Sequence, residues 1–361
     1  MLTAERKLSI ARAVRMENRR QFGRAVPSLE KLRGARLLMT GCSGLFGLWL
    51  LDLLDLGNRE LGLGITIVAL TRDKSAFAER FPQFVEMPCL VLEEGDIRSF
   101  KIRSALPTHL IHAATTTAAE TFRGTGPLDK FDTLVSGPAN LFRQIPRGSC
   151  LRSAIFLSSG VVYGALPSGA QYFEETQDSA PQPSDVSSGL GHAKRAAEFL
   201  CHAFAADRDF ALRVARCFAF SGAGLPLDLH YALGDFVHQA ASGHRVLIRG
   251  DGTAVRSYMH LGDMAIWVLC LLTEEDSSLP ATVNVGSPIG MTIKEVAEAV
   301  AARFGPRREV VVMGRSDYSV GNPVRSRYVP STRRAAMFGL EAWTSFEDSV
   351  DNMLTAIEIG H

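Results

Sequence analysis

The chain has 361 residues, 46% of them hydrophobic, which is enough apolar material for a large buried core. Its 39 Lys and Arg residues nearly balance 38 Asp and Glu, and the net charge of +1 argues against a nucleic-acid partner. No uncharged apolar run reaches the roughly 18 residues that a membrane span requires. The six cysteines contain no CxxC pair, which disfavours a disulfide framework or a metal site. We therefore expect a cytoplasmic globular protein without a membrane anchor, a metal or a bound nucleic acid.

The first 33 residues are the basic part of the chain. They hold nine Lys and Arg and three Asp and Glu, a net charge of +6, so the remainder carries −5. Their composition favours a helix and lacks the long apolar run of a secretory signal. We expect an added helix that ends near Gly23 and Pro27 and packs on the body or at an oligomer contact. A transit peptide and an RNA- or membrane-associated role remain alternatives for this segment.

Six short apolar runs alternate with helical segments up to residue 217. The predicted strands are 36–40, 65–70, 89–92, 109–113, 154–157 and 210–217, and the predicted helices between them include 45–56, 127–143 and 192–205. Strands that alternate with helices in this way indicate an α/β protein with a parallel, doubly wound sheet.

Beyond residue 220 the predicted elements are shorter and less regular. Helices are expected at 230–242, 262–273, 293–304 and 345–358, with short strands near 246–248, 282–286 and 309–313. These elements indicate a smaller α/β lobe. We therefore divide the chain into the extension 1–33, a sheet domain 34–222 and a lobe 223–361 that is interleaved with it.

A glycine-rich loop lies at the first junction of strand and helix. Residues 40–47 read TGCSGLFG, with glycines at 41, 44 and 47. Gly41 permits a tight turn, Gly44 lets the backbone approach a pyrophosphate, and Gly47 lets the helix pack closely on the strand. The helix N-terminus adds N–H donors and a partial positive charge. The spacing is GxxGxxG, and its place between a strand and a helix predicts a dinucleotide site.

Further motifs follow the loop in a fixed order along the chain. They are Asp96-Ile97, His112-Ala113-Ala114, SSGVVYG at 158–164, RCFAFSG at 216–222, Gly250-Asp251-Gly252 with Arg256-Ser257-Tyr258 and Asp263, Asn284-Val285-Gly286, and Tyr328-Val329-Pro330. Each motif alone is weak. Together they resemble the extended short-chain dehydrogenase/reductase superfamily, and within it the NAD-dependent epimerase/dehydratase family of nucleotide-sugar enzymes, over about residues 34–342.

The resemblance implies a Rossmann domain that binds NAD or NADP and a smaller lobe that binds a nucleotide-diphosphate sugar. It also implies a homodimer, formed through two long helices of which 192–205 is one. The residues implied at the cofactor are Gly41, Ser43, Gly44, Leu45, Phe46, Gly47, Arg72, Asp96, Ile97, Ala113, Ala114, Lys194 and Cys217. Those implied at the substrate are Ser159, Tyr163 and Arg256, and the catalytic pair is Ser159 and Lys194. A guanidinium such as that of Arg256 pairs with phosphate oxygens in a planar, two-pronged geometry.

The end of the second strand bears on the choice of cofactor. An acidic residue there binds the ribose in NAD enzymes, whereas an arginine accommodates the extra phosphate of NADP. Here Thr71 takes the acidic position and Arg72 follows it, which favours NADP. In the alternative, Arg72 stacks on the adenine and Asp73 reaches the ribose of NAD.

The catalytic helix departs from the family pattern. The family's base is the tyrosine of a YxxxK motif, and in this chain Lys194 is present while the tyrosine position is Leu190. A leucine cannot accept a proton. His192 lies two residues further along the helix and therefore points about 200° away from Leu190. Among the other candidates, Tyr163 usually serves structure in the family, and Tyr172 lies in a loop toward the substrate.

A second departure concerns the kind of reaction. The dTDP-glucose 4,6-dehydratases carry Asp-Glu where this chain has Gly160 and Val161, so ordinary 4,6-dehydration is disfavoured. Two hypotheses follow: an active nucleotide-sugar epimerase- or dehydratase-like enzyme with an atypical base, or a cofactor-binding homologue without catalysis that has a regulatory or structural role. The sequence leaves open which sugar is bound, which carbon reacts and which group replaces the tyrosine.

Overall fold

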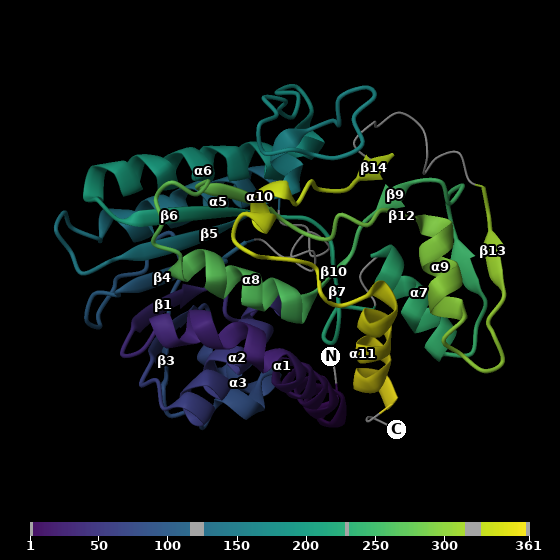
Figure 1. Ribbon diagram of the computed structural model, residues 1–361, viewed down its shortest axis with the longest axis horizontal. Coiled ribbons are helices and arrows are strands. Elements are labelled where there is room, and N and C mark those ends of the chain that lie inside the picture. The colour runs from purple at the N-terminus through teal and green to yellow at the C-terminus, as the bar shows by residue number, and fades with distance from the viewer. Residues whose placement is uncertain (1–2, 116–125, 228–230, 315–325, 359–361) are drawn as a thin grey trace.

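A computed structural model describes residues 3–115, 126–227, 231–314 and 326–358. A large sheet with helices on both faces forms one part, and a smaller lobe lies beyond one end of its strands (Figure 1). None of the helices in these ranges combines the length and the apolarity that a bilayer crossing requires.

The large sheet has seven strands, and every pair in it is parallel. The strands are β1 (Arg36–Thr40), β2 (Thr66–Thr71), β3 (Leu90–Glu94), β4 (His109–His112), β5 (Ser153–Ser159), β6 (Ala211–Cys217) and β11 (Thr282–Val285), in the order β11-β6-β5-β4-β1-β2-β3. This order confirms the predicted doubly wound sheet. From β1 the chain first adds β2 and β3 on one side and then crosses over to add β4, β5 and β6 on the other side. Ligands of such sheets bind at the carboxyl ends of the strands beside this switch point, which lies between β1 and β4.

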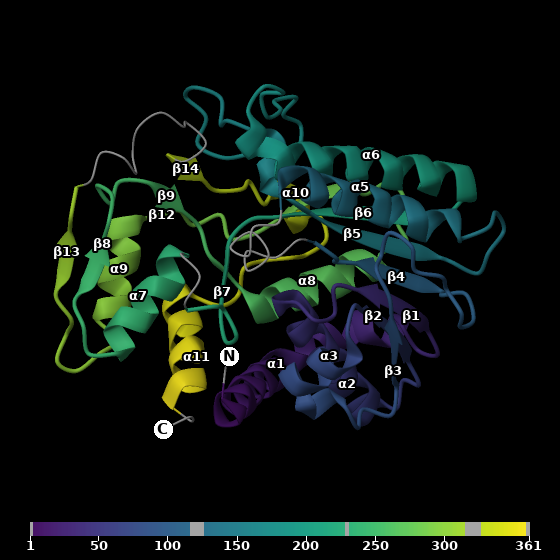
Figure 2. The ribbon, with the colours of Figure 1, turned by 180° about the vertical axis from the view of Figure 1, so that it is seen from behind.

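Helices cover both faces of the sheet (Figures 1 and 2). One face carries α5 (Pro127–Arg143) and α6 (Gly189–Arg208), and the other carries α1 (Ala4–Lys31), α2 (Leu45–Leu61), α3 (Lys74–Arg80) and α8 (Leu261–Thr273). Almost all of α8 is buried, because this helix packs between the sheet and α1. A helix that is apolar all round belongs in such an inner position.

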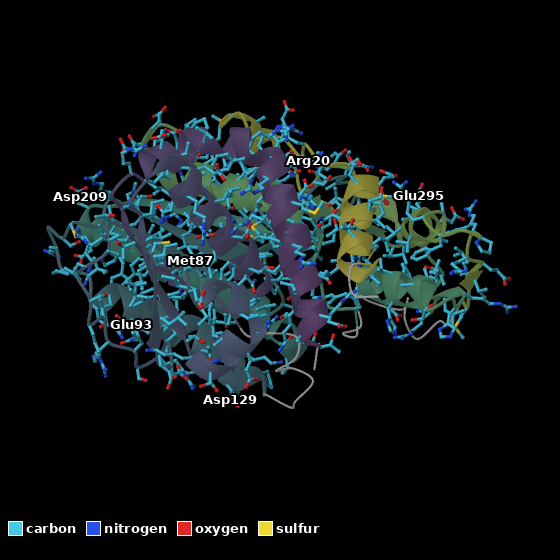
Figure 3. The ribbon with its side chains drawn as sticks, turned by 90° about the horizontal axis from the view of Figure 1, so that it is seen from below. Arg20, Met87, Glu93, Asp129, Asp209 and Glu295 are labelled. Carbon is cyan, nitrogen blue, oxygen red and sulfur yellow. The ribbon has the colours of Figure 1, made fainter. Side chains whose placement is uncertain are left out.

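The N-terminal extension is a helix packed on the body, as the sequence predicts. It lies across α2, α8 and α11 (Phe346–Glu358), and Figure 3 shows this face from below. The predicted end near Gly23 and Pro27 is wrong, since α1 continues to Lys31. Buried side chains at Ala25 and Leu29 hold the last turns against the body, and this packing outweighs the hydrogen bond lost at the proline.

The helices and strands predicted beyond residue 220 are present, but two of them, 262–273 and 282–286, belong to the large sheet and its covering helices. The elements of the smaller lobe are α7 (Ala232–Ala241), α9 (Ile293–Ala301), α11, β8 (Val246–Ile248) paired with β13 (Val310–Val312), and a three-stranded sheet of β12 (Met291–Thr292), β9 (Val255–Arg256) and β14 (Arg327–Tyr328). The short strands β7 (Phe220–Ser221) and β10 (Met259–His260) pair where the chain passes between the two parts. Both α8 and β11 return to the large sheet, so the lobe interleaves with it. A short helix, α10 (Arg333–Ala336), follows β14.

Candidate active site

The glycine loop joins β1 to α2 at the carboxyl edge of the sheet. Gly41 has φ 75°, and a Cβ there would lie 2.5 Å from the carbonyl carbon of Ala113. A Cβ on Gly47 would lie 2.1 Å from the Cys42 carbonyl oxygen. Gly44 is the N-cap residue of α2 and has no side chain that could cap the helix. The N–H groups of the first helical turn are therefore left for another partner. These positions allow the loop to lie flat against the ends of β1 and β4.

This arrangement fits the pyrophosphate of a dinucleotide. The partly exposed loop and first helical turn, Ser43 to Phe46, offer backbone donors and the positive end of the α2 dipole to an anion. Ala113 and Ala114 continue the end of β4 and donate N–H bonds of 3.2 Å to the Thr40 carbonyl and hydroxyl oxygens. The backbone at the end of β4, beside the glycine loop, is thus fixed by hydrogen bonds to Thr40.

The ends of β2 and β3 form the outer part of the predicted cofactor site. Asp73 accepts a 2.8 Å bond from Ala76 N and caps α3, while Thr71 is buried and donates to the Asp73 carbonyl. Arg72 is exposed, and its charge helps to lower the pKa of Asp96, although the hydrogen bond from Arg98 is the larger cause. Arg72 and Asp73 are thus both exposed at the end of β2, and the Asp73 carboxylate is engaged as the N-cap of α3.

Ile97 follows Asp96 and anchors this end of β3. Its side chain is buried against Gly137, and its carbonyl accepts a 2.9 Å bond from Asn140 on α5. The side chain of Ile97 therefore belongs to the core, and any contact with the cofactor would use its backbone.

Lys194 lies at the ends of β5 and β6. Its ammonium donates a 2.8 Å bond to the Leu157 carbonyl and stands 4.8 Å from the centre of the Phe156 ring. Burial lowers the pKa of Lys194 to about 8, because taking an ammonium out of water disfavours its charged form. Cys217 and Ser159 are register partners on β6 and β5 beside it. The structure thus brings the predicted catalytic pair to one edge of the sheet.

Leu190 lies one helical turn before Lys194, on the same side of α6. Its side chain is 42% exposed, so it does not fill the core. His192 instead makes a 3.1 Å contact with the Gln182 carbonyl. The helix therefore presents an apolar, accessible side chain where the resembled family carries its base.

A buried network supports the strand ends from behind. Arg216 and Glu198 form an ion pair of 2.7 Å, and the Arg216 guanidinium lies 4.7 Å from the centre of the Tyr163 ring. Tyr163 is fully buried in the 3-10 turn η2 (Gly160–Tyr163), and its hydroxyl donates a 2.7 Å bond to Asn284. Burial raises the pKa of Tyr163 to about 12. These contacts give Tyr163 a structural role, and its predicted contact with substrate stays a prediction.

The smaller lobe brings Arg256 and Tyr328 to the same edge. Arg256 lies on β9, donates to the Val255 carbonyl, and is the register partner of Tyr328 on β14. The Tyr328 hydroxyl lies against Gly160, the residue after Ser159, since a Cβ on that glycine would come within 2.6 Å of it. Sequence reasoning named Tyr328 only as part of a motif and gave it no role. The Tyr328-Val329-Pro330 motif was the sequence signal for this residue. The two-residue strand β14 carries too little periodicity to predict that it pairs with β9.

Fold and site together define a Rossmann-type dinucleotide-binding protein with a second lobe placed over the carboxyl edge of its sheet. Residues 37–286 match the model of the NAD dependent epimerase/dehydratase family, and the chain belongs to that family. This confirms the resemblance drawn from the ordered motifs. The predicted nicotinamide cofactor agrees with the family.

Individual relatives are distant. The chain is 24% identical to UDP-glucuronic acid decarboxylase 3 of Arabidopsis thaliana over 278 residues, which is 76% of each chain. Among solved structures, it resembles an epimerase of Methanothermobacter thermautotrophicus with a TM-score of 0.74 and 18% identity, covering 93% of this chain and 96% of that one. It resembles UDP-glucose 4-epimerase of Thermotoga maritima with a TM-score of 0.71 and 20% identity, covering 89% and 98%. These structures share the fold.

Proposed function

We propose that the protein is an NAD(P)-dependent enzyme that modifies a nucleotide-diphosphate sugar. The observation that carries the proposal is the meeting of three groups at one sheet edge: the glycine loop, the pair Ser159 and Lys194, and Arg256 from the smaller lobe. A cofactor site, a reacting centre and an anchor for phosphate are the parts that such an enzyme requires.

Each part has a separate task. The loop and the α2 N-terminus bind the cofactor pyrophosphate, Ser159 orients the reacting sugar hydroxyl, and Arg256 binds the substrate diphosphate. Lys194 places a positive charge beneath the reacting centre, where it favours loss of a nearby proton. When bound, the nicotinamide accepts a hydride from a sugar carbon and later returns it.

The turn after Ser159 narrows the class of reaction. A Cβ at Gly160 would lie 2.6 Å from the Tyr328 hydroxyl and 2.7 Å from Phe218 Cζ, so an acidic side chain has no room there. This supports epimerisation or decarboxylation over 4,6-dehydration. UDP-glucuronic acid and UDP-glucose are the first substrates to test, since relatives are named for activity on them.

The test is incubation with UDP-, dTDP-, GDP- and CDP-sugars, each with NAD and with NADP, followed by NMR analysis of the sugar. We expect a new sugar from at least one nucleotide sugar. Unchanged sugars throughout would contradict the proposal and favour the non-catalytic alternative. The variant Leu190→Tyr separates the two further: gain of activity from none indicates a lapsed enzyme, whereas loss of an existing activity indicates a rewired one.

We also propose that the enzyme prefers NADP. Support comes from the end of β2, where Arg72 is exposed and the Asp73 carboxylate caps α3. Arg72→Ala is expected to weaken NADP binding about tenfold or more, because a charge-assisted contact with phosphate contributes about 1.5–3 kcal/mol, and to change NAD binding little. Calorimetric titration with both cofactors measures this. Tighter binding of NAD than of NADP by the unaltered protein would contradict the preference.

We propose further that the protein is a homodimer formed through α5 and α6, which pack side by side on one face of the sheet. Both helices expose large apolar side chains. Leu128 is 83% exposed, Phe199 is 71% exposed, and Phe131 is also exposed. Large apolar side chains exposed on two adjacent helices favour pairing of this face with another protein, and a second copy of the chain is the partner the family resemblance implies.

A further inference from the structure

Leu190 leaves the reacting centre without the phenol that the resembled enzymes use, but among the residues that the structure describes, Tyr328 places its hydroxyl at that centre. The hydroxyl of Tyr328 lies close enough to Ser159 for this neighbour to lower its pKa. It also lies directly against Gly160, because a Cβ on that glycine would come within 2.6 Å of it. Glycine at 160 therefore makes the space that the Tyr328 hydroxyl occupies beside Ser159.

Tyr328 also lies between the two ends of the proposed substrate site. On one side its hydroxyl lies against Gly160, which follows Ser159 at the end of β5, and on the other its backbone is in register with Arg256 on β9. The residue is partly exposed. A nucleotide sugar held by its phosphates at Arg256, with its sugar at Ser159, would pass this phenol (Figure 1 shows β14 on the side of the smaller lobe that faces the large sheet).

The phenol is held firmly in this position. The ring centre of Tyr328 lies 4.5 Å from that of Phe218 and 5.8 Å from that of Phe173. The flanking backbone is fixed on both sides, by a 2.9 Å bond from Phe173 N to the Val329 carbonyl and a 2.7 Å bond from Val255 N to the Ser326 carbonyl. A group that is held in place before the substrate arrives loses little entropy in the reaction.

We propose that Tyr328 is the catalytic acid–base residue of this enzyme, taking the place of the tyrosine absent at Leu190. The inference rests on the proposed function. In the oxidation, the C–H electron pair leaves as hydride to the bound nicotinamide and the O–H bond breaks. The proton then bonds to the phenolate Oη of Tyr328, and a carbonyl forms at the sugar carbon. In the reverse step Oη returns the proton to the sugar oxygen.

The groups around Tyr328 predict how the step depends on pH. Burial raises the pKa of the Tyr328 phenol above its ordinary value, and Cys217 and Tyr163 also raise it, whereas the Ser159 hydrogen bond and Arg256 lower it. The phenol is therefore mostly protonated at neutral pH. Since the oxidation needs the phenolate, kcat should rise about tenfold per pH unit above neutral pH.

The central variant is Tyr328→Phe, which keeps the ring in its aromatic cluster and removes only the hydroxyl. We expect kcat to fall by about 100-fold or more and the alkaline rise to disappear, with nucleotide-sugar binding by calorimetry changed less than about threefold. Retention of kcat and of the alkaline rise in Tyr328→Phe would overturn the inference.

A second readout does not depend on turnover. The chain has six tyrosines, and their ionisation can be followed by ultraviolet difference absorbance. Oxidised cofactor carries a positive nicotinamide, so its binding should move the titration of one tyrosine to lower pH. The shift should vanish in Tyr328→Phe and persist in Tyr258→Phe, whose ring packs against Phe346 at 5.6 Å. A shift that survives in Tyr328→Phe would overturn the assignment.

The two proposals fail in different ways. A wild-type protein that converts no nucleotide sugar contradicts the proposed function and this inference with it. A wild-type protein that converts one, while Tyr328→Phe keeps its kcat, contradicts only the assignment of Tyr328.

Discussion

Lys194 is buried at 3% exposure, and its ammonium makes one hydrogen bond to a backbone carbonyl and a contact with an aromatic face. Its pKa falls from 10.5 to about 8 on folding. Between these two values the unfolded chain binds more protons than the folded one, so stability rises with pH there. Below about pH 8 the folded protein bears the full cost of the buried charge. A side chain that lowers the stability of the fold in this way is expected where it serves the function of the protein.

Lys194→Met is therefore expected to lower turnover by about 100-fold or more without lowering the free energy of unfolding at neutral pH. The rise in stability from about pH 8 to about pH 10, roughly 1.4 kcal/mol per unit, should disappear. Chemical denaturation across this range measures both. Lys294→Met is the control, since that side chain is 58% exposed and should leave the slope unchanged. A loss of several kcal/mol in Lys194→Met would show instead that the lysine holds the fold.

At the scale of elements, α1 is joined to α2 by a partly buried cluster of charges. Arg15 contacts Asp52 at 2.7 Å and Asp55 at 2.6 Å, and Asn18 donates to Asp52 at 2.8 Å. Burial raises the pKa of Asp52, against the opposing effect of Arg15. The nine basic residues of the N-terminal extension thus include Arg15, which neutralises the Asp52 carboxylate of α2.

Arg15→Ala should lower the free energy of unfolding by about 3 kcal/mol, because it leaves the Asp52 carboxylate buried without its cation. The loss should shrink as the pH falls, since protonation of Asp52 relieves it. Arg19→Ala is the matched control one turn later on α1: its contact with Glu60 is exposed, and its removal should change stability by less than about 0.5 kcal/mol. Equal losses in both variants, measured by urea denaturation, would contradict this account of the interface.

Gly41 lies in the loop between β1 and α2, and Gly34, which precedes β1, serves as its matched control. Gly41 and Gly34 both have positive φ, 75° and 67°, so alanine at either position should cost about 1–2 kcal/mol of backbone strain. Only at Gly41 would the new Cβ meet the end of β4, since nothing lies within 4 Å at Gly34. We expect Gly41→Ala to weaken cofactor binding at least about tenfold and Gly34→Ala to leave it unchanged. Similar affinities in calorimetric titration would place the cofactor elsewhere.

The sequence predicted the elements that carry strong local signals. The buried strands, the glycine loop and the helix Pro127–Arg143 are where periodicity and composition placed them. The end of α1 was mispredicted because tertiary burial of Leu29 outweighs Gly23 and Pro27. The position of Tyr328 escaped prediction for another reason: a two-residue strand is defined by its partner β9, which lies far away in the sequence.

At the scale of the whole molecule, two interleaved parts meet at one edge of the sheet, and the opposite faces are covered by helices (Figure 1). The α5–α6 face is the one that exposes Leu128 and Phe199. Phe199→Glu should convert a dimer to a monomer in sedimentation analysis, because a charge there would be buried without a partner. Met337→Glu is the control, since this exposed residue follows α10, whose Ala335 packs with the core of α1, α2 and α8 and not with that of α5 and α6. A wild-type monomer at micromolar concentration would contradict the proposed dimer.

We propose that a hydride leaves a nucleotide sugar at the edge of the sheet where Ser159, Lys194 and Tyr328 lie. The most direct measurement is a rapid-mixing experiment in which the enzyme, loaded with oxidised cofactor, meets UDP-glucuronic acid or UDP-glucose. We expect a transient rise in the near-ultraviolet absorbance of reduced nicotinamide that is slowed when deuterium replaces the transferred hydrogen and is about 100-fold slower or more in Lys194→Met. Product formation without any reduced nicotinamide or isotope effect would contradict it.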